Sequence, residues 1–209
     1  MTTLVVGANG QIGRQFCELA QQAGAPVRAM IRNPQQQAWF AERGIDTVIA
    51  DLEGDIDGAF AGCDELVFTA GSGPHTGPDK TLLIDLYGAM RCADLAVEHG
   101  MRRYTMVSAI RAEDPLAAPE KLRPYMAAKY AADVHLRHAA ITHVILKPGR
   151  LTDAPPSGRI STSLDTAAGI DISRANVARA LLHVVQHPEL RDREYVLLDG
   201  DQPIAEALT

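Results

Sequence analysis

Residues 4–13 read Leu4-Val5-Val6-Gly7-Ala8-Asn9-Gly10-Gln11-Ile12-Gly13. The apolar run at 4–6 is short and partly β-branched, as in a buried strand, and the glycines at 7, 10 and 13 give the spacing G-x-x-G-x-x-G. Gly7 allows a sharp turn off the strand, Gly10 a close approach to a pyrophosphate, and Gly13 tight packing of the next helix on the sheet. That helix begins near Ile12 and presents its unpaired N–H groups and positive dipole end to the anion. The stretch therefore predicts a phosphate cradle.

The surroundings of the motif make it more specific. The spacing alone also fits a glycine-rich turn without a ligand. Here a strand precedes it, a helix follows it, and a second apolar run, Val27 to Ile31, comes about 20 residues later, as a dinucleotide-binding unit requires. We therefore expect a bound dinucleotide.

Strand and helix patterns alternate along the rest of the chain. Apolar runs predict further strands at 27–31, 47–50, 65–69, 104–107, 143–147 and 195–198. Helical spacing and capping residues predict helices at 12–23, after Asn33-Pro34, and at 56–60, 79–98, 124–138 and 173–186. This pattern predicts an α/β fold, a doubly wound parallel sheet (Rossmann fold) with strand order 3-2-1-4-5-6 and one last strand. We expect a single domain over 1–209, with 150–172 forming a small C-terminal lid or substrate segment.

Composition limits the class of protein. The 209 residues suffice for one sizeable core, and 46% hydrophobic with 22% charged residues is typical of a globular protein. The net charge of −6, with only short basic clusters, argues against binding to nucleic acid. No signal sequence or long apolar run is seen, so we expect a cytoplasmic protein without membrane contact.

The cysteines and histidines do not suggest a metal or a disulfide framework. Cys17, Cys63 and Cys92 lie far apart and are expected to fill the core. His183 and His187 have the i, i+4 spacing of a metal-binding pair, but no third ligand accompanies them. We therefore predict no metal.

Residues that follow the strands are the candidates for cofactor recognition, because the ligand of such a sheet lies across the C-terminal strand ends. Arg32 follows the second strand, where Asp or Glu is usual for an unphosphorylated ribose, and its guanidinium suits a 2′-phosphate. A solvated surface arginine is the alternative. Asp51-Leu52 can bond and cover the adenine, or Asp51 can be a capping or loop residue. The small residues of Thr69 to Gly73 allow the backbone to approach the cofactor.

A second group of residues predicts proton-transfer chemistry. Ser108 ends the fifth strand, and Tyr125 with Lys129 forms Y-x-x-x-K near the start of the next helix, so both share one helix face. A cation beside the phenol is expected to lower its pKa, so that Tyr125 exchanges a proton with a substrate carbonyl or hydroxyl near neutrality. Ser108 can hydrogen-bond the same oxygen. A structural role for these residues is the alternative.

Several blocks of the chain resemble one family. They are Val5 to Gly13, Met30 to Pro34, Asp51-Leu52, Thr69 to Gly73, Lys80 to Asp85, Val107-Ser108, Tyr125 to Ala132, Leu146 to Asp153, Ser157 to Ile160 and Leu197 to Asp201. Together they resemble the short-chain dehydrogenase/reductase superfamily. More narrowly, they are similar to its atypical NAD(P)-binding subgroup, whose members are often labelled sugar epimerases or NAD-dependent epimerase/dehydratases.

The resemblance implies NADP(H), rather than NAD(H), as the cofactor. The residues it implies for cofactor binding are Gly7, Ala8, Asn9, Gly10, Gln11, Ile12, Gly13, Arg32, Asn33, Asp51, Leu52, Ala70, Gly71, Ser72, Lys129 and Pro148. It implies an active site of Ser108, Tyr125 and Lys129, with Lys129 also reaching the nicotinamide ribose. Asp85 stands where the superfamily commonly has asparagine, a departure characteristic of the subgroup, and it is the fourth candidate catalytic residue.

Three functions fit these observations. The first is an NADPH-dependent reductase of a small carbonyl substrate with Tyr125 as proton donor. The second is a non-catalytic NADP(H) redox sensor that acts on a protein partner. The third is an NAD(P)-dependent epimerase or dehydratase. The roughly 60 residues after Pro148 leave little room for a nucleotide-sugar pocket, which disfavours the third.

Overall fold

The structure, a computed structural model, describes residues 1–73, 75–164 and 169–209. At its centre is a nine-stranded sheet with the order β11-β8-β10-β6-β5-β4-β1-β2-β3. Its strands are β1 (Thr3–Val6), β2 (Val27–Ile31), β3 (Asp46–Ile49), β4 (Glu65–Phe68), β5 (Arg103–Val107), β6 (Thr142–Pro148), β8 (Arg159–Ser161), β10 (Arg193–Asp199) and β11 (Gln202–Pro203). All pairs from β3 to β10 are parallel, and β8 and β11 add an antiparallel edge. The predicted order 3-2-1-4-5-6 is confirmed, and the predicted last strand, β10, lies beside β6.

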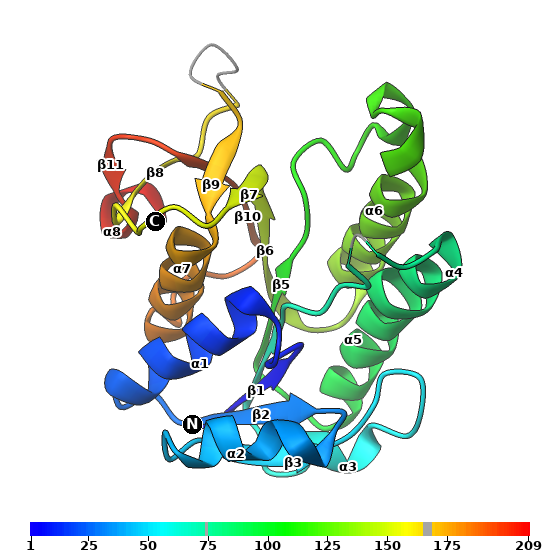
Figure 1. The fold of residues 1–209 in the computed structure, drawn as a ribbon, viewed down its shortest axis with the longest axis vertical. Helices are drawn as coiled ribbons and strands as arrows, with labels where there is room; N and C mark the ends of the chain where they lie inside the picture. The colour runs from blue at the N-terminus through cyan, green and yellow to red at the C-terminus, as the bar shows by residue number, and fades with distance from the viewer. Residues whose placement is uncertain (74, 165–168) are drawn as a thin grey trace.

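Helices cover both faces of the sheet, which is seen nearly edge-on in Figure 1. One face carries α1 (Gln11–Gln22), α2 (Gln37–Ala41) and α7 (Arg174–Gln186). The other carries α3 (Asp57–Phe60), α5 (Ala89–Glu98) and α6 (Arg123–His138). Shorter helical pieces are η1 (Pro34–Gln36), α4 (Pro78–Lys80), η2 (Thr81–Gly88), η3 (Pro115–Ala117), η4 (Glu120–Leu122) and α8 (Ile204–Ala207). No helix in the described residues is long and apolar enough to cross a membrane.

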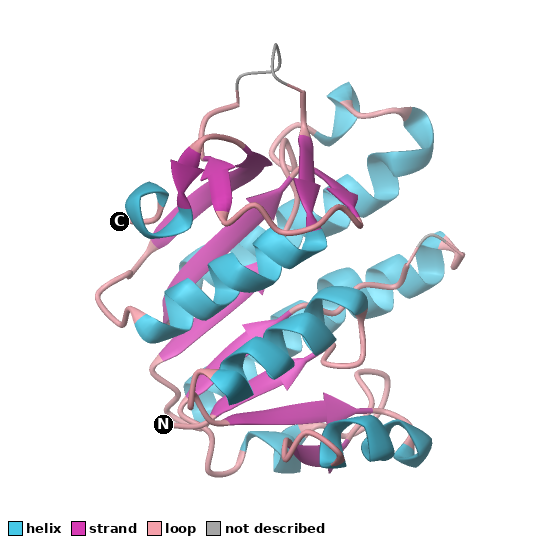
Figure 2. Ribbon diagram, turned by 60° about the vertical axis from the view of Figure 1, so that its left-hand side comes forward, coloured by secondary structure: helices cyan, strands magenta, loops and turns pink. Residues whose placement is uncertain are grey.

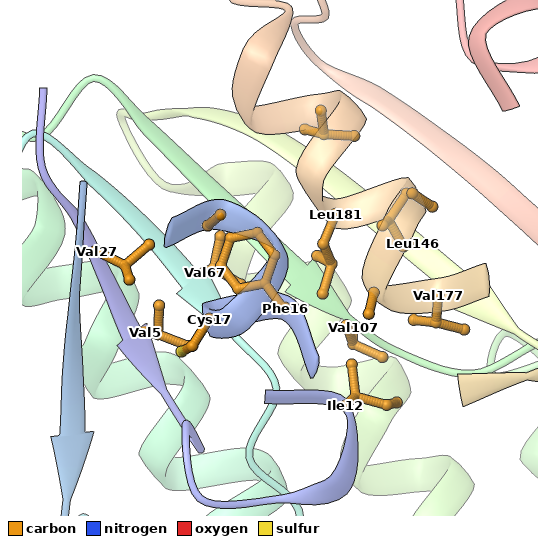
Figure 3. Close-up of a cluster of buried hydrophobic side chains, with 14 of the residues drawn as sticks. Val5, Ile12, Phe16, Cys17, Val27, Val67, Val107, Leu146, Val177 and Leu181 are labelled. Carbon is orange, nitrogen blue, oxygen red and sulfur yellow. The ribbon is translucent and has the colours of Figure 1, made fainter. Parts of the chain in front are cut away.

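Alternation along the strands divides the core into two clusters. Val5 belongs to the cluster that contains α1 and α7, whereas Leu4 and Val6 belong to the cluster that contains α5, on the opposite face. Figure 3 shows the first cluster, in which Phe16 of α1 lies among side chains from the sheet and α7. Because both faces are covered, the central strands read as continuous apolar runs, which is why their positions could be predicted. The three cysteines are buried, as expected of core residues.

Two segments differ from the sequence-based expectation. The predicted regular helix at 79–98 is instead α4, η2 and α5 in succession, and η2 is a π-helix. The segment 150–172 contains β7 (Arg150–Thr152), which pairs in parallel with β9 (Asp171–Ser173) in a separate two-stranded sheet, and β8 of the main sheet. Figure 2 shows these short strands gathered at one end of the molecule. Residues 165–168 of the predicted lid lie outside the described residues, and the lid itself stays a prediction.

Candidate nucleotide-binding and active site

The glycine loop between β1 and α1 is packed so closely that side chains would not fit. Gly7 has φ +83°, and a Cβ there would lie 2.4 Å from the Ala70 nitrogen. A Cβ on Gly13 would lie 2.3 Å from the carbonyl oxygen of Gly7. The N-cap of α1 is Gly10, which has no side chain to bond the first N–H groups of the helix. The loop and helix end therefore have the form of an anion cradle.

Asn9, at the apex of this loop, is held by a neighbouring arginine. The Nε and Nη2 atoms of Arg14 donate to Asn9 Oδ1 at 2.9 and 2.6 Å. The Arg14 guanidinium lies 4.8 Å from the centroid of the Trp39 ring, and that of Arg43 lies 4.0 Å from it. These contacts join the cradle to α2, and sequence reasoning did not identify them because they link separate elements.

A cavity of about 460 Å³ opens beside the cradle, at the C-terminal ends of β1 to β4. It is lined by these predicted cofactor residues: Gly7, Asn9, Gly10, Arg32, Asp51, Leu52, Ala70, Gly71 and Ser72. Among the other lining residues, sequence reasoning missed four polar ones: Gln36, Glu53, Thr76 and Lys80. Lys80 Nζ lies 2.5 Å from Glu53 Oε2, so a salt bridge joins two sides of the cavity. The size and lining of the cavity suit part of a nucleotide.

Two predicted cofactor residues also make local turn contacts. Asn33 Oδ1 accepts from the Gln35 nitrogen at 2.9 Å, so Asn33 caps η1 as its place before Pro34 predicts. Asp51 Oδ1 accepts from the Glu53 nitrogen at 3.1 Å. Asp51 thus lines the cavity and is a loop-forming aspartate at the same time.

The candidate catalytic residues come from three elements and lie together. Ser108 follows β5, Tyr125 and Lys129 lie on α6, and Asp85 lies on η2. Lys129 Nζ lies 3.2 Å from Asp85 Oδ1 and 5.7 Å from the centroid of the Tyr125 ring. Asp85 Oδ2 accepts from the Ser72 nitrogen at 2.9 Å, which connects this group to the cavity wall. The four candidate residues themselves are not among the described residues that line the cavity.

Three of the four candidate residues are buried, Tyr125 is half-buried, and the charges of the cluster interact. Ser108, Lys129 and Asp85 are exposed by 2%, 3% and 1%. Burial lowers the pKa of the Lys129 ammonium, but Tyr125 and Asp85 outweigh that effect, and its pKa stands above the ordinary value. Lys129 is therefore a cation already paired with Asp85.

The pKa of Tyr125 departs from the sequence-based expectation. Burial raises the pKa of the phenol, Lys129 lowers it as predicted, and Asp85 and Asp133 raise it further. The net shift is upward, so the predicted fall toward neutrality is wrong in this structure. The spacing of Tyr125 and Lys129 does not reveal the carboxylates that accompany the lysine. A phenol with a raised pKa is a proton donor rather than a base at neutral pH.

Sequence reasoning missed Asp133, which follows Tyr125 and Lys129 on α6 at the same interval of four residues. Its side chain is 1% exposed. Burial raises the pKa of its carboxyl to about 6, against the lowering effect of the Ser108 hydroxyl and of the Lys147, Arg137 and Lys129 charges. The repeated interval was a signal that could have found it.

The remaining predicted residues have mainly structural contacts. The carbonyl oxygen of Pro148, at the end of β6, accepts from the Ile110 nitrogen at 3.0 Å. The rings of His183 and His187 stack with centroids 3.9 Å apart. Within 1–73, 75–164 and 169–209, no group of three or more His, Cys, Asp or Glu side chains is placed to hold a metal ion.

Comparison with known proteins agrees with this geometry. A family model described as NAD(P)H-binding matches residues 7–188. The uncharacterised sugar epimerase YhfK of Bacillus subtilis is 41% identical over 212 residues, covering 100% of this chain and 99% of the relative. A solved structure from Bacillus halodurans, whose name describes an NAD-dependent epimerase/dehydratase, superposes with TM-score 0.94 and is 37% identical in sequence. The match covers 100% of this chain and 98% of that chain. The structure of the oxidoreductase ylbE of Lactococcus lactis superposes with TM-score 0.88 at 22% identity, and the match covers 100% of this chain and 95% of that chain. This similarity is one of fold.

Proposed function

The chain belongs to the NAD(P)H-binding family, and from that premise we propose that it is an NADP(H)-dependent reductase of small carbonyl compounds with Tyr125 as the proton donor. One observation carries the proposal. A tyrosine, a lysine and a serine gather at the C-terminal end of β5, and Asp85 connects them to Ser72 in the wall of the nucleotide cavity.

The cavity residues suit the nucleotide. Backbone N–H groups at the start of α1 would bind the pyrophosphate, since Gly10 leaves them uncapped. Arg32, exposed at the cavity, would form paired hydrogen bonds with a 2′-phosphate. Asp51 and Leu52 would contact the adenine, and Ala70 to Ser72 the ribose. NADPH, when bound, supplies the hydride.

The buried cluster suits proton transfer to the substrate oxygen. Tyr125 carries its proton at neutral pH because its pKa is raised, and it would donate that proton as negative charge develops on the oxygen. Ser108 would hydrogen-bond the same oxygen. Lys129, held by Asp85 and by the Val107 carbonyl oxygen at 3.3 Å, would stabilise the tyrosinate that remains.

A second function, an NADP(H) sensor, is favoured by a different observation. Leu82, Leu83 and Tyr87 of η2 are exposed by 52%, 40% and 53%, beside the buried Asp85. Such an apolar surface suits a protein partner. In that case occupancy of the cavity would act on the partner through η2, and no substrate would be turned over.

The names of two relatives point to an epimerase or dehydratase. Most of the described chain after β6 forms β7 to β11, α7 and α8, and Asn176 ties α7 to Ser157 and Asp199. Little of that segment is left to enclose a nucleotide sugar. We therefore rank this activity below the reductase.

The test is to titrate the protein with NADPH and NADH by fluorescence and then to follow NADPH absorbance with aldehydes, quinones and ketones. Binding with turnover that Tyr125→Phe abolishes supports the reductase. Tight NADPH binding with no turnover across the panel contradicts it and favours the sensor. Cofactor that copurifies and does not exchange favours the epimerase or dehydratase, because such enzymes recycle it within each turnover.

A further inference from the structure

Arg14, the fourth residue of α1, makes two hydrogen bonds to one atom of the glycine loop. Its Nε and Nη2 atoms both donate to Asn9 Oδ1, at 2.9 and 2.6 Å. A guanidinium has N–H donors and no acceptor, so only the oxygen of the Asn9 amide can face it. The contact therefore fixes the orientation of the amide, and the NH2 group of Asn9 is directed away from Arg14.

This NH2 group is left available for a ligand. Asn9 lines the nucleotide cavity together with Gly7 and Gly10. Within residues 1–73, 75–164 and 169–209, the hydrogen bonds of the Asn9 side chain are the two that its oxygen accepts from Arg14. The wall of the cavity therefore contains an oriented side-chain amide whose N–H donors have no protein partner in the described chain.

The Arg14 side chain is also held by an aromatic ring. Its guanidinium carbon lies over the Trp39 ring, 4.8 Å from the centroid, a distance at which a cation is attracted to an aromatic face. Trp39 packs edge to face with Phe40 of α2, with ring centroids 4.9 Å apart, and Phe40 is fully buried. The position of Arg14 is thus set by contacts that lead into the core.

We propose that Arg14 is a positioning residue of the nucleotide site, which orients the Asn9 amide so that its NH2 group donates to the pyrophosphate. The oxygens of a pyrophosphate are anionic acceptors, which an NH2 group binds and an amide oxygen repels. The nitrogens of Gly10 and Arg14 are already bonded, to the carbonyl oxygens of Gly7 and Gly10, at 2.9 Å each. The N–H groups of residues 11–13, between them, have no partner within the helix. Asn9 adds a side-chain donor to this backbone set.

The inference rests on nucleotide binding at the cradle and is independent of the reductase activity. Its test is a double-mutant cycle in the full chain, with dissociation constants for NADPH and NADH measured by calorimetry. Arg14→Met and Asn9→Ala are each expected to weaken binding about 10-fold, the effect of one hydrogen bond to a charged group. Because Arg14 acts through Asn9, the double variant should bind no more weakly than either single variant. Losses that multiply in the double variant would show that Arg14 acts by its own charge or by stabilising the fold, and would overturn the proposal.

Comparison of the two nucleotides identifies the group that is bound. The pyrophosphate is common to NADPH and NADH, so Arg14→Met and Asn9→Ala should weaken both by the same factor. A loss confined to NADPH would place the Asn9 amide at the 2′-phosphate and overturn the assignment to the pyrophosphate.

Asn9→Asp separates the donor from the contact with Arg14. The carboxylate still accepts from both Arg14 nitrogens, but it has no N–H group to offer a ligand. We expect both nucleotides to bind at least as weakly as in Asn9→Ala, while the free energy of unfolding in urea does not fall. A purely structural role of Asn9 would leave the affinity intact, so an Asn9→Asp protein that binds like the wild type overturns the proposal.

Arg43→Met is the matched control. The Arg43 guanidinium also lies over the Trp39 ring, at 4.0 Å, but it donates to Glu18 and to the Trp39 carbonyl oxygen rather than to the glycine loop. Both dissociation constants should stay at the wild-type values. A loss equal to that of Arg14→Met would assign the effect to the contacts of Trp39 and overturn the proposal.

The outcomes also separate this inference from the proposed reductase. Only binding is measured, so a protein that reduces no carbonyl loses the reductase function while the cycle still decides the role of Arg14. A wild-type protein that binds neither nucleotide would overturn the cradle assignment and this inference together.

Discussion

The proposed site has two halves, a nucleotide half and a reactive half, which are built in different ways. The nucleotide half is an open cavity of about 460 Å³ whose cradle is made of backbone, with glycines where a Cβ would strike a neighbouring chain. The reactive half is a buried cluster of side chains, in which Lys129, Asp85 and Asp133 set one another's charge states. One half depends on local chain geometry, and the other on burial and charge contributed by separate elements.

This difference implies that binding and chemistry are separable. Residues of the cavity wall should change cofactor affinity, and residues of the buried cluster should change rates and pH profiles. The connection between them is the bond from the Ser72 nitrogen to Asp85 Oδ2, 2.9 Å long. Each prediction that follows either tests this separation or measures how strongly the two halves are coupled.

The largest effect is expected from Tyr125→Phe. Loss of the proposed proton donor should lower any carbonyl reductase rate by about 10²–10⁴-fold. The NADPH dissociation constant should stay near the wild-type value, because Tyr125 lies outside the described cavity lining. Steady-state rates and fluorescence titration measure the two quantities. Tyr130→Phe is the control, an exposed tyrosine on the same helix. An active Tyr125→Phe variant would show that another residue donates the proton, and Asp85 would be the next candidate.

Gly13→Ala should damage the nucleotide half. Its Cβ would lie 2.3 Å from the Gly7 oxygen, so α1 has to move away from the loop. We expect the free energy of unfolding to fall by about 1–3 kcal/mol and the NADPH affinity to fall by about 10²-fold. Gly58→Ala is the matched control, since nothing lies within 4 Å of its Cβ position. Urea unfolding and fluorescence titration give both values, and a Gly13→Ala protein that binds normally would contradict the cradle assignment.

Arg32→Ala should separate the two nucleotides. Loss of a charged hydrogen bond to the 2′-phosphate weakens NADPH binding by about 10–100-fold and leaves NADH binding nearly unchanged. Titration with both nucleotides measures this difference. Arg102→Ala, an exposed arginine at the opposite end of β5, should change neither affinity. Equal losses for NADPH and NADH would remove the 2′-phosphate assignment.

The difference between local chain geometry and contacts from separate elements also decides how much of the structure can be predicted from the sequence. The glycine spacing and the buried strands are local patterns, and they predict the central sheet, its order and the cradle. The strands β7, β8, β9 and β11 were not predicted because they have two or three residues each, too few for a period, and are formed by pairing at the edge. The π-helix η2 was missed because its hydrophobic pattern is also that of an α-helix.

In the reactive half, sequence spacing identifies partners but not charge states. The interval between Tyr125 and Lys129 places both on one helix face, as the structure has them. The direction of the Tyr125 pKa shift depends on burial and on Asp85 and Asp133, which come from η2 and from two turns further along α6. Burial of a titratable group is a property of the whole fold, so no short motif predicts it.

The smallest effect, and the one that measures the coupling of the two halves, is expected from Asp85→Asn. Asp85 raises the pKa of Tyr125 and of Lys129, so removing its charge should lower both pKa values. In the proposed reaction Tyr125 can donate only while it is protonated. The alkaline fall in rate should therefore move to lower pH, by about one unit for a buried neighbour. The amide oxygen still accepts from the Ser72 nitrogen, so NADPH affinity should hold. Asp79→Asn, an exposed acid on α4, is the control. A profile that stays in place or moves to higher pH would show that Asp85 does not set the charge state of the reactive half, and a large loss of NADPH affinity would show that the two halves are not separable.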